Sequence, residues 1–136
     1  MMERARVERA DPRLDKGWCF GPWNSPLDIS VGYAQHPPDE PHLHQSTHEV
    51  YLVASGACEV QVERETVALR AGDILHVRPG EAHTFLNCSG DYFHFVVHAP
   101  GRAGDEARSD KQAVARGRLG LGDLPSSEVS ETKARR

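Results

Sequence analysis

The sequence predicts an all-β fold, a sandwich or barrel of short strands, and three observations support this prediction. Between residues 28 and 98, short runs rich in branched and aromatic residues alternate with turn residues. Residues 58–63 alternate strictly between apolar and polar side chains, which is typical of a strand with one face in a core. No helical periodicity separates the runs. Many short strands without intervening helices favour two packed sheets.

The expected strands are bounded by proline, glycine and aspartate residues. Prolines 37, 38 and 41 stiffen the approach to a short strand at residues 42–44. Gly72 and Asp73 open another strand, and Pro79-Gly80 turns the chain just before His83. In the last strand, the face with Phe93, Phe95 and Val97 is expected in the core, which leaves the opposite face, with His94 and His98, to the barrel mouth or solvent. Besides the strand at residues 42–44, strands are expected at residues 29–33, 50–54, 58–63, 66–69, 74–77, 83–86 and 92–98.

Three segments are expected. Residues 1–27 read as an irregular N-terminal segment, residues 28–100 as the barrel, and residues 101–136 as a polar tail. Residues 106–118 of the tail can form a polar helix, Leu119, Leu121 and Leu124 can dock, and the last residues look disordered. No functional role is expected of the tail.

Length and composition exclude several classes of function. With 136 residues the chain has room for one domain, and a net charge of -4 leaves no electrostatic footprint for nucleic acid. No run reaches the ~20 apolar residues needed to span a bilayer, so no membrane partner and a cytoplasmic location are expected. The 3 cysteines show no Cys-x-x-Cys spacing, which indicates neither a disulfide framework nor a thiolate zinc site.

Three histidines and a glutamate form a candidate metal site. Residues i and i+2 of a strand share a face, so His42 and His44 can point at one ion while Leu43 points away. Glu49 can return to the ion after a bend, and His83 follows the Pro79-Gly80 turn. Imidazole nitrogen with carboxylate oxygen is a ligand set that suits several divalent metals.

The segment around these first ligands resembles the first motif of the cupin superfamily. That motif reads Gly, five residues, His-x-His, three or four residues, Glu, six residues, Gly. His42, His44, Glu49 and Gly56 match it, whereas His36 stands at the leading glycine.

The second cupin motif reads Gly, five residues, Pro-x-Gly, two residues, His, three residues, Asn. Gly72, Gly80, His83 and Asn87 match it, with Arg78 at the usual proline. The resemblance covers roughly residues 28–98. It implies a double-stranded β-helix, or jelly roll, in which His42, His44, Glu49 and His83 bind one divalent metal, and it makes a homodimer the default expectation.

The ligand number bears on the identity of the metal. Four protein ligands close a tetrahedral zinc site but leave about two positions free on a metal that prefers six. Iron or manganese is therefore favoured, and zinc or nickel stays open because catalytic zinc can expand its coordination. Glu49 beside the metal can also act as a general base.

Strand parity nominates the residues around the metal. Tyr51 shares a face with Glu49 and is the second catalytic candidate, as a proton donor or an orienting hydroxyl; the alternative is a core tyrosine. Phe85 shares a face with His83. Pocket positions are also open for His76, Arg78 and His94, with solvent as the alternative; a pocket arginine would bind a carboxylate or phosphate.

Three functions compete. The leading one is oxygen-dependent, dioxygenase-type chemistry on a small organic molecule, because the ligand set leaves open coordination sites. The second is non-redox, metal-assisted isomerisation, cyclisation, rearrangement or lyase chemistry, in which Glu49 or Tyr51 moves protons. The resemblance makes both plausible. The third is a small-molecule binding or sensing module without turnover.

Overall fold

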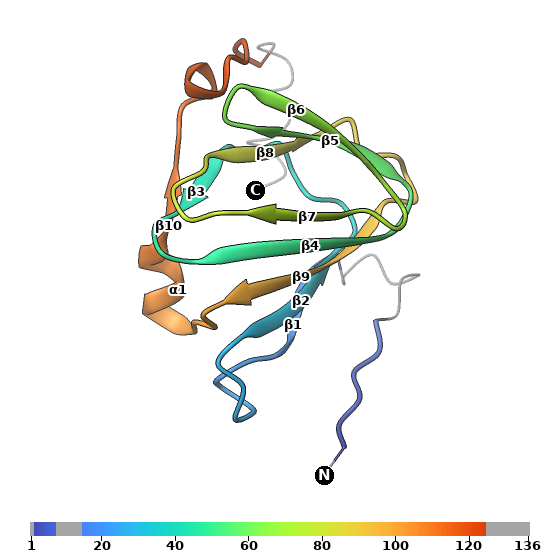
Figure 1. The fold of residues 1–136 in the computed structure, drawn as a ribbon, viewed down its shortest axis with the longest axis vertical. Helices are drawn as coiled ribbons and strands as arrows, with labels where there is room; N and C mark the ends of the chain where they lie inside the picture. The colour runs from blue at the N-terminus through green and yellow to red at the C-terminus, as the bar shows by residue number, and fades with distance from the viewer. Residues whose placement is uncertain (1, 8–14, 125–136) are drawn as a thin grey trace.

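Two five-stranded antiparallel sheets face each other in the computed structural model, which describes residues 2–7 and 15–124 (Figure 1). The first sheet has the order β1-β2-β9-β4-β7, and the second β10-β3-β8-β5-β6. The predicted all-β jelly roll is thereby confirmed. The strands are β1 (Lys16–Phe20), β2 (Ser30–Ala34), β3 (His42–His44), β4 (His48–Ser55), β5 (Ala57–Val62), β6 (Glu65–Arg70), β7 (Ile74–Val77), β8 (His83–Leu86), β9 (Phe93–Ala99) and β10 (Lys111–Ala113).

The hydrophobic core lies between the sheets, where side chains from both inner faces meet. Val60 of β5 is fully buried, and it pairs across the second sheet with Phe85 of β8. From the first sheet, Tyr51 and Val53 of β4 complete the contact. Alternation along each strand places these residues inward. The core consists of Tyr51, Val53, Cys58, Val60, Leu69, Val77, Phe85, Tyr92 and Val96.

From His94 onward, strand β9 has the opposite facing to the one expected, whereas Phe93, its first residue, is 3% exposed and buried as expected. The expected core face carries Phe95, which is 40% exposed, whereas His94 on the other face is 2% exposed. The cause is register: β9 pairs with β4 so that His94 lies opposite Val53 and Val96 opposite Tyr51. Paired residues share a face, so the inward direction of Tyr51 and Val53 turns His94 and Val96 inward as well.

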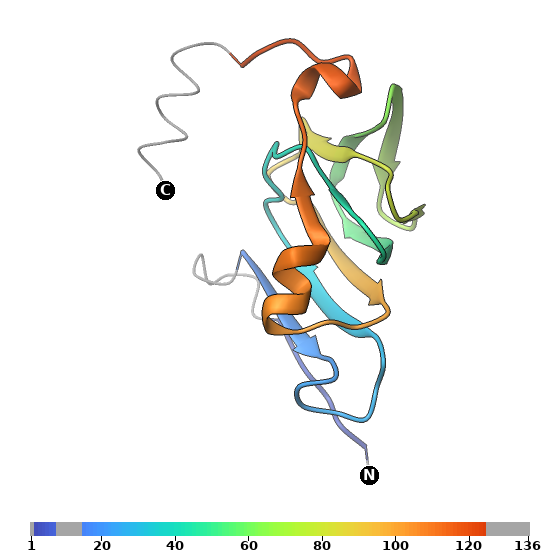
Figure 2. The ribbon, with the colours of Figure 1, turned by 90° about the vertical axis from the view of Figure 1, so that its left-hand side faces the viewer.

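Two strands lie where none was expected. Strand β1 falls in the N-terminal segment read as irregular and forms an edge of the first sheet beside β2. Strand β10 falls within the stretch read as a polar helix. The helix in the tail, α1 (Gly104–Asp110), is shorter and ends where β10 begins. In Figure 2 the orange segment of α1 and β10 runs across one side of the two sheets.

The tail after β10 docks through a second, smaller apolar cluster. Leu119, in the short 3-10 helix η2 (Arg116–Leu119), is 1% exposed and packs with Leu43 and Ala82. Leu121 packs against the same cluster. The disorder expected of the last residues concerns positions 125–136, outside the described part of the chain. Among the described residues, no helix is long and apolar enough to cross a membrane.

Candidate metal centre

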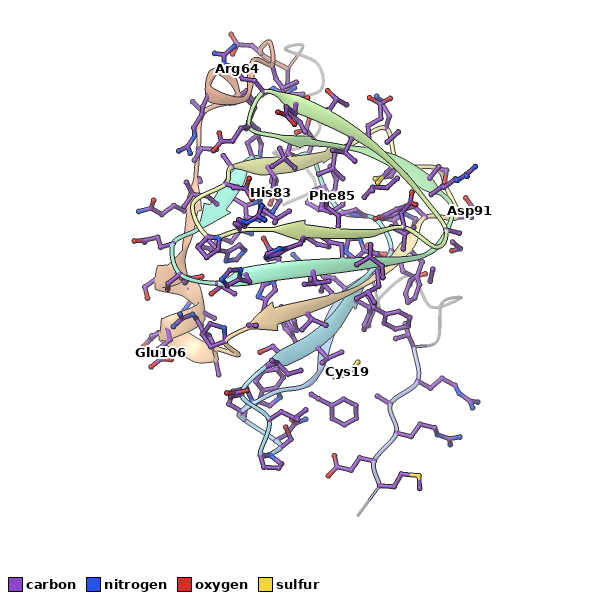
Figure 3. The ribbon with its side chains drawn as sticks, in the orientation of Figure 1. Cys19, Arg64, His83, Phe85, Asp91 and Glu106 are labelled. Carbon is purple, nitrogen blue, oxygen red and sulfur yellow. The ribbon has the colours of Figure 1, made fainter. Side chains whose placement is uncertain are left out.

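Strand β3 carries the two closely spaced histidines between two neighbouring strands. On one side, His42 lies opposite His83 of β8, and on the other side β10 pairs with β3 over its whole length. The rings of His42 and His83 are 4.4 Å apart between centroids. Figure 3 shows His83 between the two sheets, near Phe85.

Glu49 brings the first sheet to these histidines. One ligand atom each of His42, His44 and Glu49 lie within 4.8 Å of one another, a separation that can hold a metal ion. Oε1 of Glu49 lies 2.9 Å from Nε2 of His83 and 3.4 Å from Nε2 of His44. His83 is therefore the fourth member of the cluster, joined to it through Glu49.

The three histidines present the same ring nitrogen to the cluster. Nδ1 of His42 lies 2.8 Å from the carbonyl oxygen of Glu40, and Nδ1 of His83 lies 3.0 Å from that of Glu81. A carbonyl oxygen only accepts hydrogen bonds, so both Nδ1 atoms carry a proton. Nδ1 of His44 lies 3.1 Å from Oδ2 of Asp110. Each Nε2 is thus left to face Glu49, the arrangement typical of metal-binding histidines.

Burial sets the charge of the histidines on β3. It is the largest cause that lowers the pKa of His42, to about 4, and repulsion from His83 adds to it. Burial also lowers the pKa of His44, against the opposing charge of Glu49. For His83 burial acts in the same direction, but contact with the Glu49 carboxylate outweighs it and raises the pKa. At neutral pH, His42 and His44 therefore hold unprotonated Nε2 atoms that can bind a metal.

Glu49 is an ionised carboxylate in a nearly closed site. Burial acts to raise its pKa, yet contacts with His83 and His98 hold that pKa well below its usual range. Its two oxygens differ. Oε2 accepts a hydrogen bond of 2.6 Å from the Tyr51 hydroxyl and lies 3.0 Å from Nε2 of His98. Oε1 is buried and has no hydrogen-bond partner among the described residues, although Nε2 of His83 lies 2.9 Å from it.

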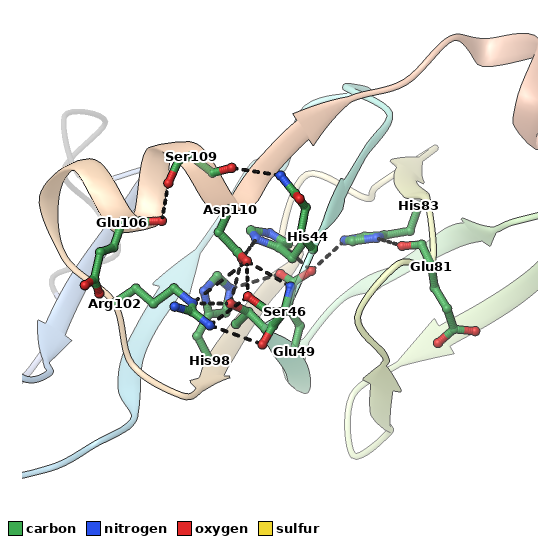
Figure 4. A network of polar contacts seen from close by, with 12 residues as sticks. His44, Ser46, Glu49, Glu81, His83, His98, Arg102, Glu106, Ser109 and Asp110 are labelled. Carbon is green, nitrogen blue, oxygen red and sulfur yellow. Dashed lines mark hydrogen bonds and ion pairs between the residues drawn. The ribbon is translucent and has the colours of Figure 1, made fainter.

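Asp110, at the end of α1, joins the cluster through His44 (Figure 4). Its Oδ2 also accepts a 2.6 Å hydrogen bond from the Thr47 hydroxyl, and its Oδ1 accepts bonds from the backbone and hydroxyl of Ser46. Burial acts to raise the pKa of Asp110, but the bonds from Thr47, Ser46 and His44 outweigh it and lower the pKa to about 2. Because an ionised carboxylate only accepts, the Asp110 contact also fixes the His44 proton on Nδ1.

The family model described as "Cupin domain" matches residues 31–99, more than half of the chain. The chain belongs to the cupin family. No curated protein matches this cupin.

Several solved structures share the fold at low sequence identity. A Cupin 2 conserved barrel domain protein from Salinispora arenicola CNS-205 is 18% identical, covers 72% of this cupin and 88% of its own chain, and superposes with a TM-score of 0.58. Pac13 from Streptomyces, described as a nucleoside dehydratase, is 14% identical over 84% and 92%, with a TM-score of 0.58. KdgF from Halomonas sp. is 21% identical over 68% and 81%, with a TM-score of 0.56.

The donor set of this cupin fits a divalent metal. Three imidazole Nε2 atoms and one carboxylate Oε1 suit iron, manganese, nickel or zinc. A buried carboxylate oxygen without a hydrogen-bond partner, beside the unprotonated Nε2 atoms of His42 and His44, is an arrangement that a cation would complete. His42, His44, Glu49 and His83 would hold it.

Of the other residues that the sequence suggests for the pocket, some lie on the inner faces of the sheets and others on the outer surface. Tyr51 is 4% exposed beside Glu49, and its hydroxyl oxygen lies 3.2 Å from Nε2 of His83. Phe85 and His94 line the inner face next to Tyr51, with ring centroids at 5.1 Å and 4.9 Å from it. They extend the site inward.

His76 and Arg78 do not lie in the pocket for which they were nominated. Both are exposed, and His76 pairs with His48 at 2.9 Å on the outer surface. The cause is strand parity: Val77 is 1% exposed and takes the inner direction, which turns its neighbours outward.

Sequence reasoning missed the roles of two residues. The sequence pattern allows His98 either the barrel mouth or solvent, whereas in the structure its side chain, 17% exposed, contacts Glu49. It lies opposite Glu49 in the β4–β9 pairing, so the register, once known, locates it. Asp110 carries no signal in the sequence, because it reaches His44 only through the pairing of β10 with β3.

Proposed function

We propose that this cupin is a metal-dependent enzyme that moves protons on a small, oxygen-bearing organic molecule, in dehydratase, isomerase or related lyase chemistry. One observation carries the proposal. The Glu49 carboxylate faces the histidine cluster with Oε1 and holds two groups capable of proton transfer, Tyr51 and His98, with Oε2. The carboxylate of Glu49 therefore contacts the candidate metal ligands with one oxygen and the candidate acid–base groups with the other.

The metal would be held by Nε2 of His42, His44 and His83 together with Oε1 of Glu49. A bound divalent metal would supply Lewis acidity, polarising a carbonyl or hydroxyl oxygen of the substrate. The chain's own contribution is to keep the ligand lone pairs in place and to exclude water, since His83 is 0% and Glu49 3% exposed.

Tyr51 is suited to donate a proton or to orient a substrate oxygen. Burial and the charge of Glu49 raise its pKa well above 10, so the hydroxyl stays protonated at neutral pH. His98 is suited to accept one. Its Nε2 donates to the ionised Glu49, which places the lone pair of a neutral ring on Nδ1, and a carboxylate-oriented imidazole is a common general base. Structural similarity to Pac13, a nucleoside dehydratase, is compatible with this class of reaction.

Oxygen-dependent, dioxygenase-type chemistry is the second candidate. The observation that favours it is the ligand count: three nitrogens and one carboxylate oxygen leave about two positions on a six-coordinate iron or manganese. In that case Tyr51 and His98 would position the substrate beside the metal.

Parallel assays with different metals distinguish the candidates. The metal-free protein is loaded with zinc, nickel, manganese or ferrous iron and incubated anaerobically with hydroxy-carbonyl compounds and nucleosides, and product formation is followed by mass spectrometry. Turnover without oxygen, retained with zinc, supports the proposal. Turnover that requires both oxygen and a redox metal supports the second candidate.

Matched variants show whether turnover belongs to this site. His42→Ala removes a ligand and should abolish activity, whereas His76→Ala removes an exposed histidine and should not. A compound that binds the metal-loaded protein and is recovered unchanged with every metal would contradict an enzyme and indicate a binding or sensing module.

A homodimer and a cytoplasmic location complete the proposal. Partly buried and exposed apolar side chains on the outer face of the first sheet, including Phe95 and Ile74, which is 66% exposed, support self-association through that face. Sedimentation equilibrium of the purified protein tests the dimer, and a monomer at all concentrations would contradict it.

A further inference from the structure

His44 differs from the other two histidines in how its ring is oriented. His42 and His83 each donate from Nδ1 to a backbone carbonyl two residues earlier, so local structure alone orients their rings. His44 instead depends on the side chain of Asp110, 66 residues further along the chain. The lone pair that His44 would offer to a metal is therefore set by the C-terminal tail.

We propose that Asp110 is a positioning residue of the metal site: the tail segment α1–β10 delivers its carboxylate to Nδ1 of His44 and thereby keeps the metal-binding lone pair on Nε2. The inference rests on the proposed function, because it assigns a role toward the same metal. It gives a function to the polar tail, for which the sequence suggested none.

The backbone fixes where Asp110 lies. Lys111, the next residue, pairs with His44 in the β10–β3 ladder, and the carbonyl of Asp110 accepts a 2.9 Å hydrogen bond from the backbone of Gln45. The amide of the Gln45 side chain bonds the carbonyl of Ser109 at 3.0 Å. With backbone bonds on both sides of it, the Asp110 carboxylate has little freedom to leave His44.

The other bonds to the carboxylate determine which of its atoms faces His44. Oδ1 accepts from the Ser46 amide at 2.9 Å and from the Ser46 hydroxyl at 2.8 Å, while Oδ2 accepts from Thr47 and His44. Arg102 bonds Thr47 and Ser46 from outside and approaches Oδ1 to 3.9 Å. A backbone amide can only donate, so the atom at the Oδ1 position must remain an oxygen.

An asparagine at this position should therefore reverse the tautomer of His44. Its carbonyl oxygen would take the Oδ1 position, opposite the Ser46 amide, and its NH₂ group would face Nδ1 of His44. Because NH₂ only donates, the neutral ring would have to place its proton on Nε2, where it blocks the metal. Asp110→Asn should then impair metal binding at least as much as Asp110→Ala, although asparagine is closer in shape.

Two control variants separate positioning from stability. Thr47→Val removes a hydrogen bond to the same oxygen, Oδ2, but leaves an acceptor opposite His44. It should reduce stability yet keep the tautomer. Asp105→Asn changes a carboxylate of the same helix whose side chain is 97% exposed and pairs with Arg108. It should leave both the tautomer and metal binding unchanged.

The tautomer is measured by two-bond ¹H–¹⁵N NMR of the histidine rings in the metal-free protein, and zinc affinity by competition with a chromogenic chelator. In Asp110→Asn we expect the His44 proton on Nε2 and a loss of affinity of about 10–100-fold. Wild-type affinity with an unchanged tautomer in Asp110→Asn would overturn the inference, as would an equal loss of affinity in Thr47→Val. If the wild type binds no metal, the proposed function fails, whereas the tautomer measurement still tests Asp110.

Discussion

The hydroxyl of Tyr51 donates a 2.6 Å hydrogen bond to Oε2 of Glu49, from a position two residues further along the same strand. Residues two apart in a strand share a face, so β4 by itself presents both groups to the interior. The bond occupies Oε2 and leaves Oε1 for the histidine cluster. Tyr51 thereby helps to orient the carboxylate of Glu49.

Removing the Tyr51 hydroxyl should weaken the metal-free protein. Tyr51→Phe deletes a bond to an ionised, buried carboxylate, and such bonds contribute about 1.5–3 kcal/mol to stability. We expect a decrease of that size in the free energy of unfolding, measured by urea denaturation. Tyr33→Phe is the matched control, because Tyr33 is also a buried tyrosine and its ring packs beside Phe93. Equal losses in both variants would contradict a special role for the Tyr51 bond.

His94 should make the stability depend on pH between about 6.5 and 4. Burial lowers its pKa in the folded protein to about 4, from 6.5 in the unfolded chain. In this range the unfolded chain binds a proton that the folded protein does not. The free energy of unfolding should therefore fall as the pH is lowered from about 6.5 to about 4, by about 3 kcal/mol for this group.

His94→Phe tests that pH dependence. The variant keeps an aromatic ring beside Tyr51 and Phe85 but cannot be protonated. Urea denaturation of the metal-free protein across this pH range should give a shallower slope in the variant, with the contribution of His42 retained. His36→Asn, at an exposed position, should keep the wild-type slope. An unchanged slope in His94→Phe would show that His94 does not carry the effect.

Leu119→Ala should loosen the tail and reduce metal affinity at a distance. Leu119 is 1% exposed in a small cluster with Leu43 and Ala82, and truncation of a buried leucine costs about 2–5 kcal/mol. We expect faster amide hydrogen exchange at β10 together with weaker zinc binding. Leu27→Ala, at a position that is 42% exposed, serves as the control. Faster exchange without any change in affinity would separate the tail from the metal site.

His76 and Arg78 should be neutral toward the metal. Both are exposed on the outer surface, so His76→Ala and Arg78→Ala should bind zinc like the wild type and change stability by about 0.5 kcal/mol or less. His42→Ala, measured alongside by the same chelator competition, should lose binding. A clear loss of affinity in Arg78→Ala would place that side chain closer to the metal than the structure does.

The sequence was most informative where a local pattern defines the chemistry. The one-residue gap between His42 and His44 requires a shared face in a strand, and the Pro79-Gly80 turn places His83 at the start of the next one. These features lie within a few residues of the side chains that they position. They nominated the cluster, whereas the all-β class followed from the succession of short strands and the jelly roll from the resemblance to cupins.

Such patterns do not predict which face of a strand is buried or which distant strands pair. Alternation in β9 reveals two faces but not which one is buried, and the phenylalanines made the outer face seem the better core. For the same reason, the sequence does not decide whether His98 faces the barrel mouth or solvent. Strand β10 has only three residues, with no strand-like composition, and forms because β3 offers it an edge. Asp110 could not be found without that pairing.

The pairing of β10 with β3 also protects the protein against self-association at high concentration. Without β10, the outermost strand of the second sheet would be β3, whose unpaired backbone groups could recruit a strand from another molecule. The tail covers those groups with a strand of its own chain, at the place where the sheet carries two histidines. Proteolytic removal of residues beyond 103 would expose the unpaired edge of β3, so the shortened protein should self-associate and precipitate.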